Sequence, residues 1–318
     1  MIVTVTLNPT LDRTLSVPKF QLGELNRAQV VRQDLGGKGI NVSRALRALG
    51  VPSQMVGFMG GATGQVMRNG LLAAGFEVRF VEVEGETRRN ITLLDEASGK
   101  YTKINEPGPT ASPQDVAALK AQLDQMLRPG DLWAFCGSLP PGASPDLYAQ
   151  LMRQVQEGGG HAFLDSSGLA LREGLTGHPF GIKPNSEEVA ELLHSPLRSD
   201  AEHCVAARRL RAQGVSLVAV TRGAHGLVLA MAGETLLAAP PSVAVRSPVG
   251  AGDAALAGLL WAVSERCDAL ETARRAVACG TAAAMQEGTG VGGRALVERL
   301  LRQVQVTSFR TEEDDAEE

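Results

Sequence analysis

A glycine-rich turn near residue 250 stands directly in front of an apolar helical stretch. It reads Gly250, Ala251, Gly252, Asp253. Backbone N–H groups in the first turn of a helix have no partner within the helix, and together with the helix dipole they bind anions. A carboxylate there can accept a proton from an attacking hydroxyl, while the amides stabilise charge on a transferred group. The turn predicts Asp253 as a general base and residues 250–252 as an anion hole; the alternative is an aspartate that only caps the helix.

A second glycine run, Gly36-Gly37-Lys38-Gly39, also opens a helical pattern. Glycines allow a ligand to approach the backbone closely, Lys38 offers a cation for a phosphate, and Asn41 can bridge sugar hydroxyls. The chain contains no G-x-x-x-x-G-K-[ST] sequence, and the G-x-G-x-x-G spacing is not met here either. The alternative is a glycine turn with a solvated lysine.

Two further polar turns follow strand-like runs. Lys183-Pro184-Asn185 leads within three residues to Glu188. Hard oxygen ligands suit Mg²⁺, so Asn185 and Glu188 are predicted near this ion and its waters. The alternative is ordinary helix-start chemistry, with proline ending the strand and acids in the first helical turn. The segment from Thr221 to Gly226 is either a plain hairpin turn or a loop that contacts a nucleotide.

The elements that must position these turns alternate along the chain. Strands are expected at residues 2–7, 54–58, 131–136, 161–165, 180–183, 217–221 and 226–230. Helices are expected at residues 39–49, 64–74, 113–127, 145–156, 186–193, 200–213, 252–264, 270–286 and 294–303. This alternation predicts an α/β fold with a mostly parallel sheet covered on both faces. Because the carboxyl ends of parallel strands share one crevice, the four turns should meet in one site.

Residues 11–35 and 76–105 break this alternation. Their pattern indicates antiparallel strands with one solvent-exposed face, which predicts a small sheet that projects from the main sheet as a lid. The alternative is a pair of ordinary surface hairpins. Residues 1–310 otherwise read as a single domain. The tail, residues 311–318, has six acidic residues out of eight and is expected to be disordered.

The composition is that of a cytoplasmic globular protein. Hydrophobic residues make up 44% of the 318 residues, the formal net charge is −4, and no long Lys/Arg stripe suggests a nucleic-acid partner. The four cysteines form no C-x-x-C pair and have no metal-ligand spacing, so reduced thiols are expected. The longest apolar stretch, residues 254–263, is too short to span a membrane, and no secretory signal is recognisable.

These turns, in this order, resemble the phosphofructokinase B group of the ribokinase-like carbohydrate kinases. Three further stretches match the group: Thr6–Asp12, Thr87–Asn90 and Gly137–Gly142. The resemblance covers almost the whole chain except the tail. It implies a ribokinase-like three-layer α/β/α fold with a mostly parallel central sheet and a small β-sheet lid. It also implies ATP and Mg²⁺, a small sugar-phosphate substrate, and a possible homodimer through the lid.

The resemblance implies roles for individual residues. Asp253 matches the catalytic base, and the amides of Gly250, Ala251 and Gly252 match the anion hole. The positions on the sugar-phosphate side are Asp12, Gly36, Gly37, Lys38, Asn41, Arg88, Lys103 and Ser138, of which the three basic residues face the phosphate that the substrate already carries. The positions on the ATP side are Lys183, Asn185, Thr221, Gly223 and Gly226, with Glu188 and Asn185 serving Mg²⁺ indirectly. Pro248, where many relatives have Thr or Ser, removes a hydroxyl and a backbone donor near the nucleotide.

Within the group, Lys38 and the stretch Thr102–Thr110 look closest to 1-phosphofructokinases. This resemblance implies phosphate transfer from ATP to D-fructose 1-phosphate, giving fructose 1,6-bisphosphate. Tagatose 6-phosphate and fructose 6-phosphate are alternative acceptors, because the same pocket could hold a phosphate at either end of a ketose. A non-catalytic sugar-phosphate sensor on the same fold is a further alternative, which the intact Asp253 turn disfavours.

Overall fold

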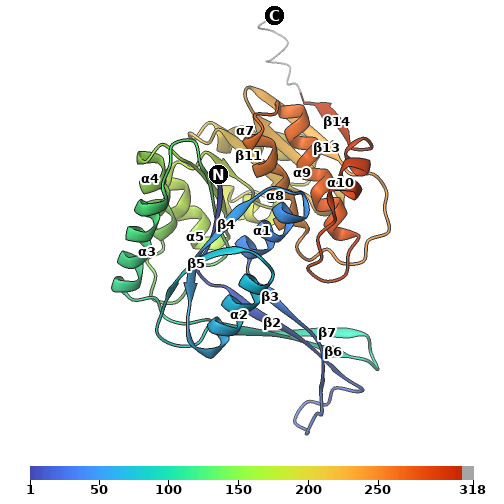
Figure 1. Ribbon diagram of the computed structural model, residues 1–318. Helices are drawn as coiled ribbons and strands as arrows, with labels where there is room; N and C mark the ends of the chain where they lie inside the picture. Colours follow the sequence, from blue (N-terminus) through green and yellow to red (C-terminus); the bar gives the residue numbers. More distant parts are fainter. Residues whose placement is uncertain (310–318) are drawn as a thin grey trace, which may run out of the picture.

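The computed structural model describes residues 1–309 and shows a twisted sheet with helices on both faces and a smaller sheet projecting from it (Figure 1). The main sheet has ten strands in the order β14-β13-β12-β11-β10-β9-β8-β1-β4-β5. Neighbours from β11 to β5 run parallel, and β12, β13 and β14 extend the other edge through antiparallel pairs. The bounds are β1 Ile2–Thr6, β4 Ser53–Met59, β5 Glu77–Glu82, β8 Leu132–Cys136, β9 His161–Asp165, β10 Gly181–Ile182, β11 Leu217–Thr221, β12 Leu227–Met231, β13 Glu234–Ala239 and β14 Gln305–Ser308.

The helices form two layers. One layer packs through a shared apolar core on one face of the sheet and consists of α1 (Lys38–Ala48), α8 (Ala251–Ser264), α9 (Ala269–Ala284) and α10 (Arg294–Leu301). The other face is covered by α3 (Pro113–Met126), α4 (Leu147–Glu157), α5 (Gly168–Gly174), α6 (Ser186–Leu193) and α7 (Asp200–Arg211). Alternate residues of β8 serve the two cores, as the two-residue period of a strand requires. The three-layer α/β/α prediction is confirmed.

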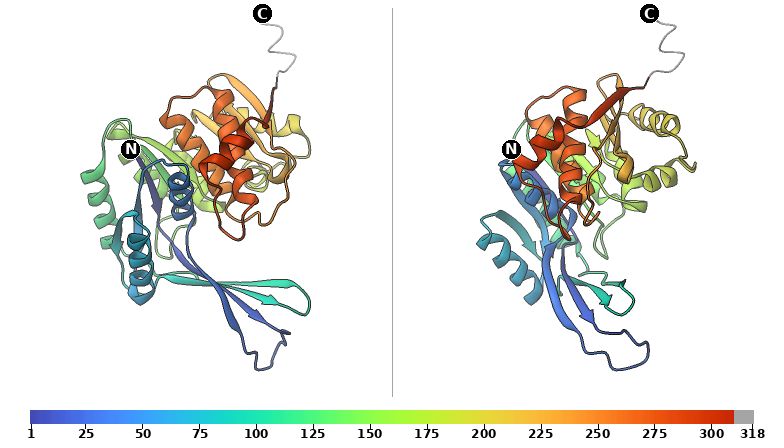
Figure 2. Two further views of the ribbon diagram at one scale, coloured as in Figure 1. Left: turned by 45° about the vertical axis from the view of Figure 1, so that its right-hand side comes forward. Right: turned by 90° about the vertical axis from the view of Figure 1, so that its right-hand side faces the viewer.

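The smaller sheet has the strand order β3-β2-β6-β7. Its strands are β2 (Thr10–Val17), β3 (Gln29–Gly36), β6 (Arg88–Asp95) and β7 (Lys100–Asn105). Leu11 of β2 packs with Met67 and Leu71 of α2 (Gly61–Ala73), so one end of the sheet is held by the body. The other end extends well away from the body (Figure 2). We call these four strands the lid sheet.

Two details of the lid sheet differ from the sequence prediction. Residues 77–82 form β5, which pairs with β4 in the main sheet because Phe80 packs in a buried cluster with Met55 and Met59. The second lid segment therefore begins at Arg88 rather than near residue 76. In addition, β2 and β6 pair in parallel. A period-two pattern indicates which side chains face water but does not determine the direction of the neighbouring strand.

The sequence pattern did not predict α5, β13 or β14. Helix α5 has only seven residues, and β14 is short and largely exposed, so neither produces a periodic signal. Strand β13 contains Leu236, Leu237, Ala238 and Ala239, residue types that do not favour a strand over a helix. Two 3₁₀ turns, Leu175–Gly177 and Gly223–His225, complete the described elements. The acidic tail, for which disorder is expected, lies outside the described residues. Within residues 1–309, no helix has both the length and the apolar character needed to cross a bilayer.

Candidate active site

Asp253 lies in the first turn of α8, in contact with α1. Gly250 precedes the helix with φ 80°, a left-handed conformation that glycine adopts without strain. The side chain of Asp253 is buried, and its Oδ2 accepts a 2.8 Å hydrogen bond from Nδ2 of Asn41. Asn41 belongs to α1, which starts at Lys38 within the second glycine run and has Gly37 as its N-cap. The two glycine turns therefore bring their polar side chains to the same place.

The environment raises the pKa of Asp253 from 3.8 to about 6. Burial is the largest cause, and the nearby carboxylate of Asp165 adds repulsion. The hydrogen bond from Asn41 and the positive charges of Lys38 and Lys183 act in the opposite direction. A carboxylate with this pKa is mostly ionised at neutral pH but holds a proton better than an ordinary aspartate, which suits a general base.

Asp165, at the end of β9, makes an ion pair with each of two lysines. Its Oδ1 lies 2.8 Å from Nζ of Lys38, and its Oδ2 lies 3.2 Å from Nζ of Lys183. Burial acts to raise the pKa of Asp165, but the two ammonium groups hold it below its usual value. Burial acts to lower the pKa of Lys38, and the charge and hydrogen bond of Asp165 outweigh this and raise it. Lys38 therefore remains cationic close to Asp253.

Lys183, for which the resemblance implies a place on the ATP side, lies beside the anion-hole turn. Its ammonium is buried and is 3.4 Å from the position that a Cβ on Gly252 would occupy. Asp165 is absent from the predicted site residues, although its strand-turn-helix position is the same as that of the other motifs. It ends an apolar strand and is followed by Ser166-Ser167 and then by α5. That position is the signal that could have identified it.

One face of the lid sheet carries several of the predicted sugar-side residues. The register pairs Thr10 with Arg88 and Asp12 with Asn90, and Thr92 with Lys103. Because alternate residues of a strand share a face, Arg88, Asp12 and Lys103 lie on the same one. Lys103 is exposed. It lies on the same face as Asp12, in the next row of paired residues toward the tip of the lid sheet.

Asp12 is the central acid of this lid face. A Cβ on Gly36 would overlap Oδ2 of Asp12, so any side chain at position 36 would displace the Asp12 carboxylate. Burial raises the pKa of Asp12, while Asn90, Thr10 and Arg88 act to lower it. Burial also lowers the pKa of Arg88, although Asp12 counteracts this effect. The base of the lid thus holds two partly buried, oppositely charged groups.

Asn8 connects the lid to the loop that follows β8. Its Nδ2 donates to Pro107 O at 3.0 Å and lies 3.4 Å from Oγ of Ser138, and Arg88 Nη2 donates to its carbonyl oxygen at 3.0 Å. Asn8 therefore joins two predicted substrate residues, although the sequence reasoning assigned it no role. Gly37, with φ 130°, also lies here and leaves too little space for a side chain beside Thr6.

The two turns predicted on the ATP side are neighbours. Asn185 and Thr221 form an isolated parallel bridge, and Thr221 N donates to Pro184 O at 2.9 Å. Gly223 begins the 3₁₀ turn with φ 56°, and Gly226 follows it with φ 81°. A Cβ on Gly226 would overlap the carbonyl oxygen of Ala238 in β13. Packing against β13 is therefore sufficient to explain glycine at position 226.

Asn185 and Glu188 form a reciprocal capping box at the start of α6. Oδ1 of Asn185 accepts from Glu188 N, and Oε2 of Glu188 accepts from Asn185 N, both at 2.8 Å. Helix-start chemistry thus accounts for one oxygen of each side chain. The structure shows no hydrogen bond to Oε1 of Glu188 within residues 1–309, and the charge of Glu188 acts on Lys38. The described residues contain no group of three or more His, Cys, Asp or Glu that could hold a metal ion. The free carboxylate oxygen of Glu188 is a hard donor of the kind that suits Mg²⁺ and its waters.

Comparison with known proteins identifies the family of this chain. A family model described as pfkB family carbohydrate kinase matches residues 5–294. The 1-phosphofructokinase of Rhodobacter capsulatus is 39% identical over 278 residues, covering 87% of this chain and 88% of that protein. The 1-phosphofructokinase of Bacillus subtilis is 36% identical over 307 residues, covering 96% and 99%.

Solved structures show the same likeness. Phosphofructokinase-2 from Escherichia coli in complex with fructose-6-phosphate superposes with a TM-score of 0.87 at 28% sequence identity, covering 95% of this chain and 98% of that chain. The family model spans most of the chain, and the relatives match nearly its full length. The chain therefore belongs to the pfkB family of carbohydrate kinases, which transfer a phosphoryl group to a sugar hydroxyl.

Proposed function

We propose that this kinase transfers the γ-phosphoryl group of ATP to the C6 hydroxyl of D-fructose 1-phosphate, giving fructose 1,6-bisphosphate and ADP. One observation carries the proposal: the buried carboxylate of Asp253 lies at the opening of the α8 turn, with Lys38 close by. The name shared by the R. capsulatus and B. subtilis relatives supports the choice of acceptor. We place the reaction in the cytoplasm, since both substrates are phosphorylated metabolites.

Asp253 is the general base in this proposal. As the C6 oxygen forms its bond to the γ-phosphorus, the hydroxyl proton moves to the Asp253 carboxylate, and the bond from the γ-phosphorus to the leaving oxygen of ADP breaks. Lys38 and Lys183 keep Asp253 ionised at neutral pH, because their charges oppose the burial that raises its pKa. The buried Oδ1 of Asn41 has no hydrogen-bond partner within residues 1–309, which makes it an acceptor for a sugar hydroxyl.

The α8 turn supplies the anion hole, with a modification of the sequence prediction. The N–H of Ala251 donates to Pro248 O at 3.3 Å within the turn, so it is engaged before any ligand binds. The structure shows no such bond for the N–H groups of Gly250 and Gly252 among residues 1–309. We therefore assign the stabilisation of the transferring group to these two amides, supported by Lys183 beside Gly252.

The phosphate already on the sugar would be bound by basic groups from helix α1 of the body and from the lid sheet. Lys38 comes from the body, whereas Arg88 and Lys103 lie on the lid face that also carries Asp12. Arginine binds phosphate with two parallel hydrogen bonds, and lysine acts as a point charge. Closing the lid sheet over the substrate would complete this set and exclude water from the reaction.

The ATP side is formed by the adjacent turns at Asn185 and Thr221. A magnesium ion, when bound, neutralises negative charge on the phosphates of ATP. Glu188 would hold it through water with Oε1, because Oε2 is already used in the helix cap.

We further propose that the lid sheet joins two copies of the chain. The face opposite Asp12 carries Leu15, Val30, Leu93 and Ile104, as the register shows. Val30 is 54% exposed and Ile104 is 55% exposed, so this apolar face is open in the single chain. A second lid sheet would remove these side chains from water.

A coupled assay of ADP release tests the activity. It compares fructose 1-phosphate, fructose 6-phosphate, tagatose 6-phosphate and unphosphorylated fructose, with the Asp253→Asn variant as the blank for contaminating kinases. We expect the highest kcat/KM with fructose 1-phosphate. A higher kcat/KM with another ketose phosphate would contradict the choice of acceptor, and preference for unphosphorylated fructose would remove the phosphate role of Lys38, Arg88 and Lys103.

A further inference from the structure

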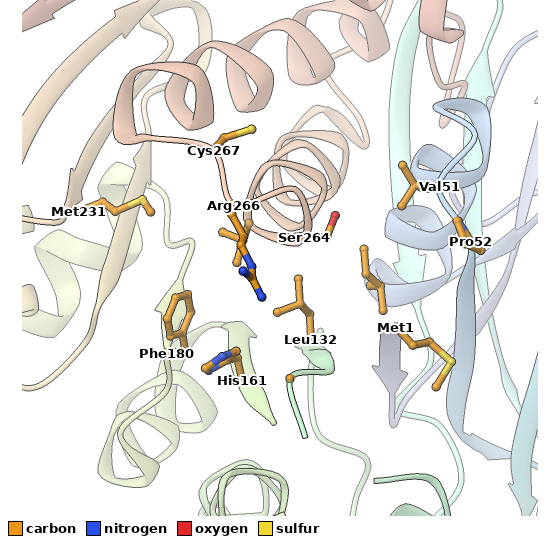
Figure 3. A pocket seen from close by; sticks show the side chains of 13 residues that line it. Met1, Val51, Pro52, Leu132, His161, Phe180, Met231, Ser264, Arg266 and Cys267 are labelled. Carbon is orange, nitrogen blue, oxygen red and sulfur yellow. The ribbon is translucent and has the colours of Figure 1, made fainter. Parts of the chain in front are cut away.

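A second pocket opens at the edge of the main sheet opposite the reaction centre. Its volume is about 620 Å³, within the range of pockets that hold small molecules. It is formed where β1, β8 and β9 begin and where α8 ends, and Figure 3 shows the side chains that surround it. We call it the amino-edge pocket.

The amino-edge pocket is separate from the reaction centre, although two elements connect them. Strand β9 runs from His161, which lines the pocket, to Asp165, which pairs with Lys38. Helix α8 runs from Asp253 to Ser264, which also lines the pocket. At about 1.5 Å per helical residue, these ends of α8 lie roughly 16 Å apart. A small molecule that fits the pocket can therefore bind there without touching the substrates.

The walls of the pocket are mostly apolar. Leu132, Phe180 and Met231 contribute large side chains, and the centroid of the Phe180 ring lies 4.7 Å from that of the His161 ring, with the two planes tilted by 45°. Such walls suit the aromatic or aliphatic body of a ligand, because burying apolar surface is favourable.

The charged side chains that line the pocket are of one sign. Arg266 and His161 are basic, and none of the lining residues is Asp or Glu. Arg266 adopts φ 57° in the turn after α8, and its guanidinium extends into the pocket between Leu132 and Phe180 (Figure 3). No carboxylate of residues 1–309 forms an ion pair with Arg266. An unpaired guanidinium among apolar walls is complementary to a ligand with one acidic group and an apolar body.

We propose that the amino-edge pocket binds small organic anions, namely aryl or medium-chain alkyl carboxylates and sulfonates. The acidic group binds to Arg266, and the apolar body lies against Leu132, Phe180 and Met231. This site goes beyond the phosphotransfer reaction and does not depend on it.

Cys267 provides a readout that is specific to this pocket. It lines the pocket and is partly exposed, whereas Cys136, Cys204 and Cys279 are buried. Burial raises the pKa of the Cys267 thiol, so labelling with a maleimide is done at mildly alkaline pH. We expect 8-anilinonaphthalene-1-sulfonate to slow the labelling of Cys267, located by mass spectrometry, in the presence or absence of ATP. Unchanged labelling at saturating probe would overturn the proposal.

A neutral probe with the same body, N-phenyl-1-naphthylamine, tests the role of charge. We expect Arg266→Ala to weaken binding of the sulfonate by about ten-fold, as loss of a charge-assisted hydrogen bond predicts, and to change binding of the neutral probe little. Arg299→Ala is the matched control, since Arg299 is an exposed arginine on α10 outside the pocket. Equal sulfonate affinities for the two alanine variants would contradict the assigned ligand class.

A variant that fills the pocket tests the location independently. Ser264 is exposed at the end of α8, so Ser264→Trp adds bulk to the pocket without entering the apolar core. We expect it to weaken binding of both probes, with ADP release unchanged in the absence of probe. If both probes bound this variant as they bind the original chain, the site would lie elsewhere and the proposal would fail.

Discussion

Nδ2 of Asn41 donates a 2.8 Å hydrogen bond to Oδ2 of Asp253, joining two residues that are 212 positions apart. This bond connects the first turns of α1 and α8, each of which begins after a glycine turn. It also opposes the rise in the pKa of Asp253 that burial produces. The proton affinity of the proposed base is thus reduced by a residue 212 positions away in the sequence.

Replacement of Asn41 by alanine should raise the pKa of Asp253 above about 6, because a hydrogen bond that lowers the pKa is lost. The acidic limb of the kcat profile should therefore move to higher pH, and part of the activity lost at pH 7 should return in more alkaline buffer. The measurement is kcat against pH at saturating substrates. Asn69→Ala, on α2, is the control, and an unshifted limb would contradict the coupling.

Replacement of Asp253 by asparagine should lower kcat by about 10²- to 10⁴-fold, the range expected for loss of a general base. The variant should remain folded, because the asparagine side-chain oxygen can still accept from Asn41. Circular dichroism and single-turnover rates check the two statements. A kcat close to that of the original chain would disprove the assignment of the base.

The same variant should change how stability depends on pH. The folded pKa of Asp253, about 6, exceeds its unfolded value of 3.8, so the folded state binds the proton more tightly. The original chain should therefore lose stability as pH rises from about 4 to about 6, and the asparagine variant should not show this contribution. The Tm of the variant minus the Tm of the original chain should therefore be larger at pH 8 than at pH 4. The opposite trend would mean that ionisation of Asp253 does not destabilise the folded protein.

Replacement of Asp165 by asparagine should destabilise the protein by about 3 kcal/mol, since it leaves the buried ammonium of Lys183 without its counterion. Because the pKa of Asp165 is depressed, its contribution is present at neutral pH and is lost only in acid. Urea unfolding at neutral pH gives the free energies. The added change Lys183→Met should restore part of the loss, whereas Glu157→Ala, at an exposed carboxylate, should have little effect.

The lid also meets the loop between α9 and α10. A Cβ on Gly288 would overlap the guanidinium of Arg32 in β3, and Thr289 lies against the Gly250 turn. Gly288→Ala and Arg32→Ala should each lower kcat/KM by about ten-fold, because both disturb how the lid rests on this loop. The double variant should be no worse than the poorer single variant if both act through one contact. Fully additive losses would show that the two residues act separately.

Charged residues introduced on the apolar face of the lid sheet should separate the proposed dimer into monomers. The double change Val30→Glu and Ile104→Glu should shift the sedimentation coefficient to that of a monomer, because buried charges without partners are costly. Tyr101→Glu is the matched control: Tyr101 is 63% exposed and lies on the opposite face of the lid sheet. Unchanged sedimentation of the double variant would exclude this face as the interface.

Local chemistry was readable from the sequence, because glycine turns before helices and the alternation of strands and helices depend on neighbouring residues. The pattern therefore predicted the parallel sheet and the smaller sheet, and it indicated Asp253, Lys38 and Asn41 as candidate site residues. It could not place residues 77–82, since half-exposed strands of either sheet have the same alternation. It also could not show that the amide of Ala251 is already hydrogen-bonded within its own turn.

What only the tertiary structure decided is which charged groups face one another. Asp165 received no site role from sequence, yet folding brings it, together with Lys183, beside Asp253 and Lys38. The reason is physical: the pKa of a buried carboxylate depends on burial and on charges from distant segments, which no local spacing encodes. The sequence determined that Asp253 stands at the start of a helix after a glycine turn, and the fold determined its proton affinity.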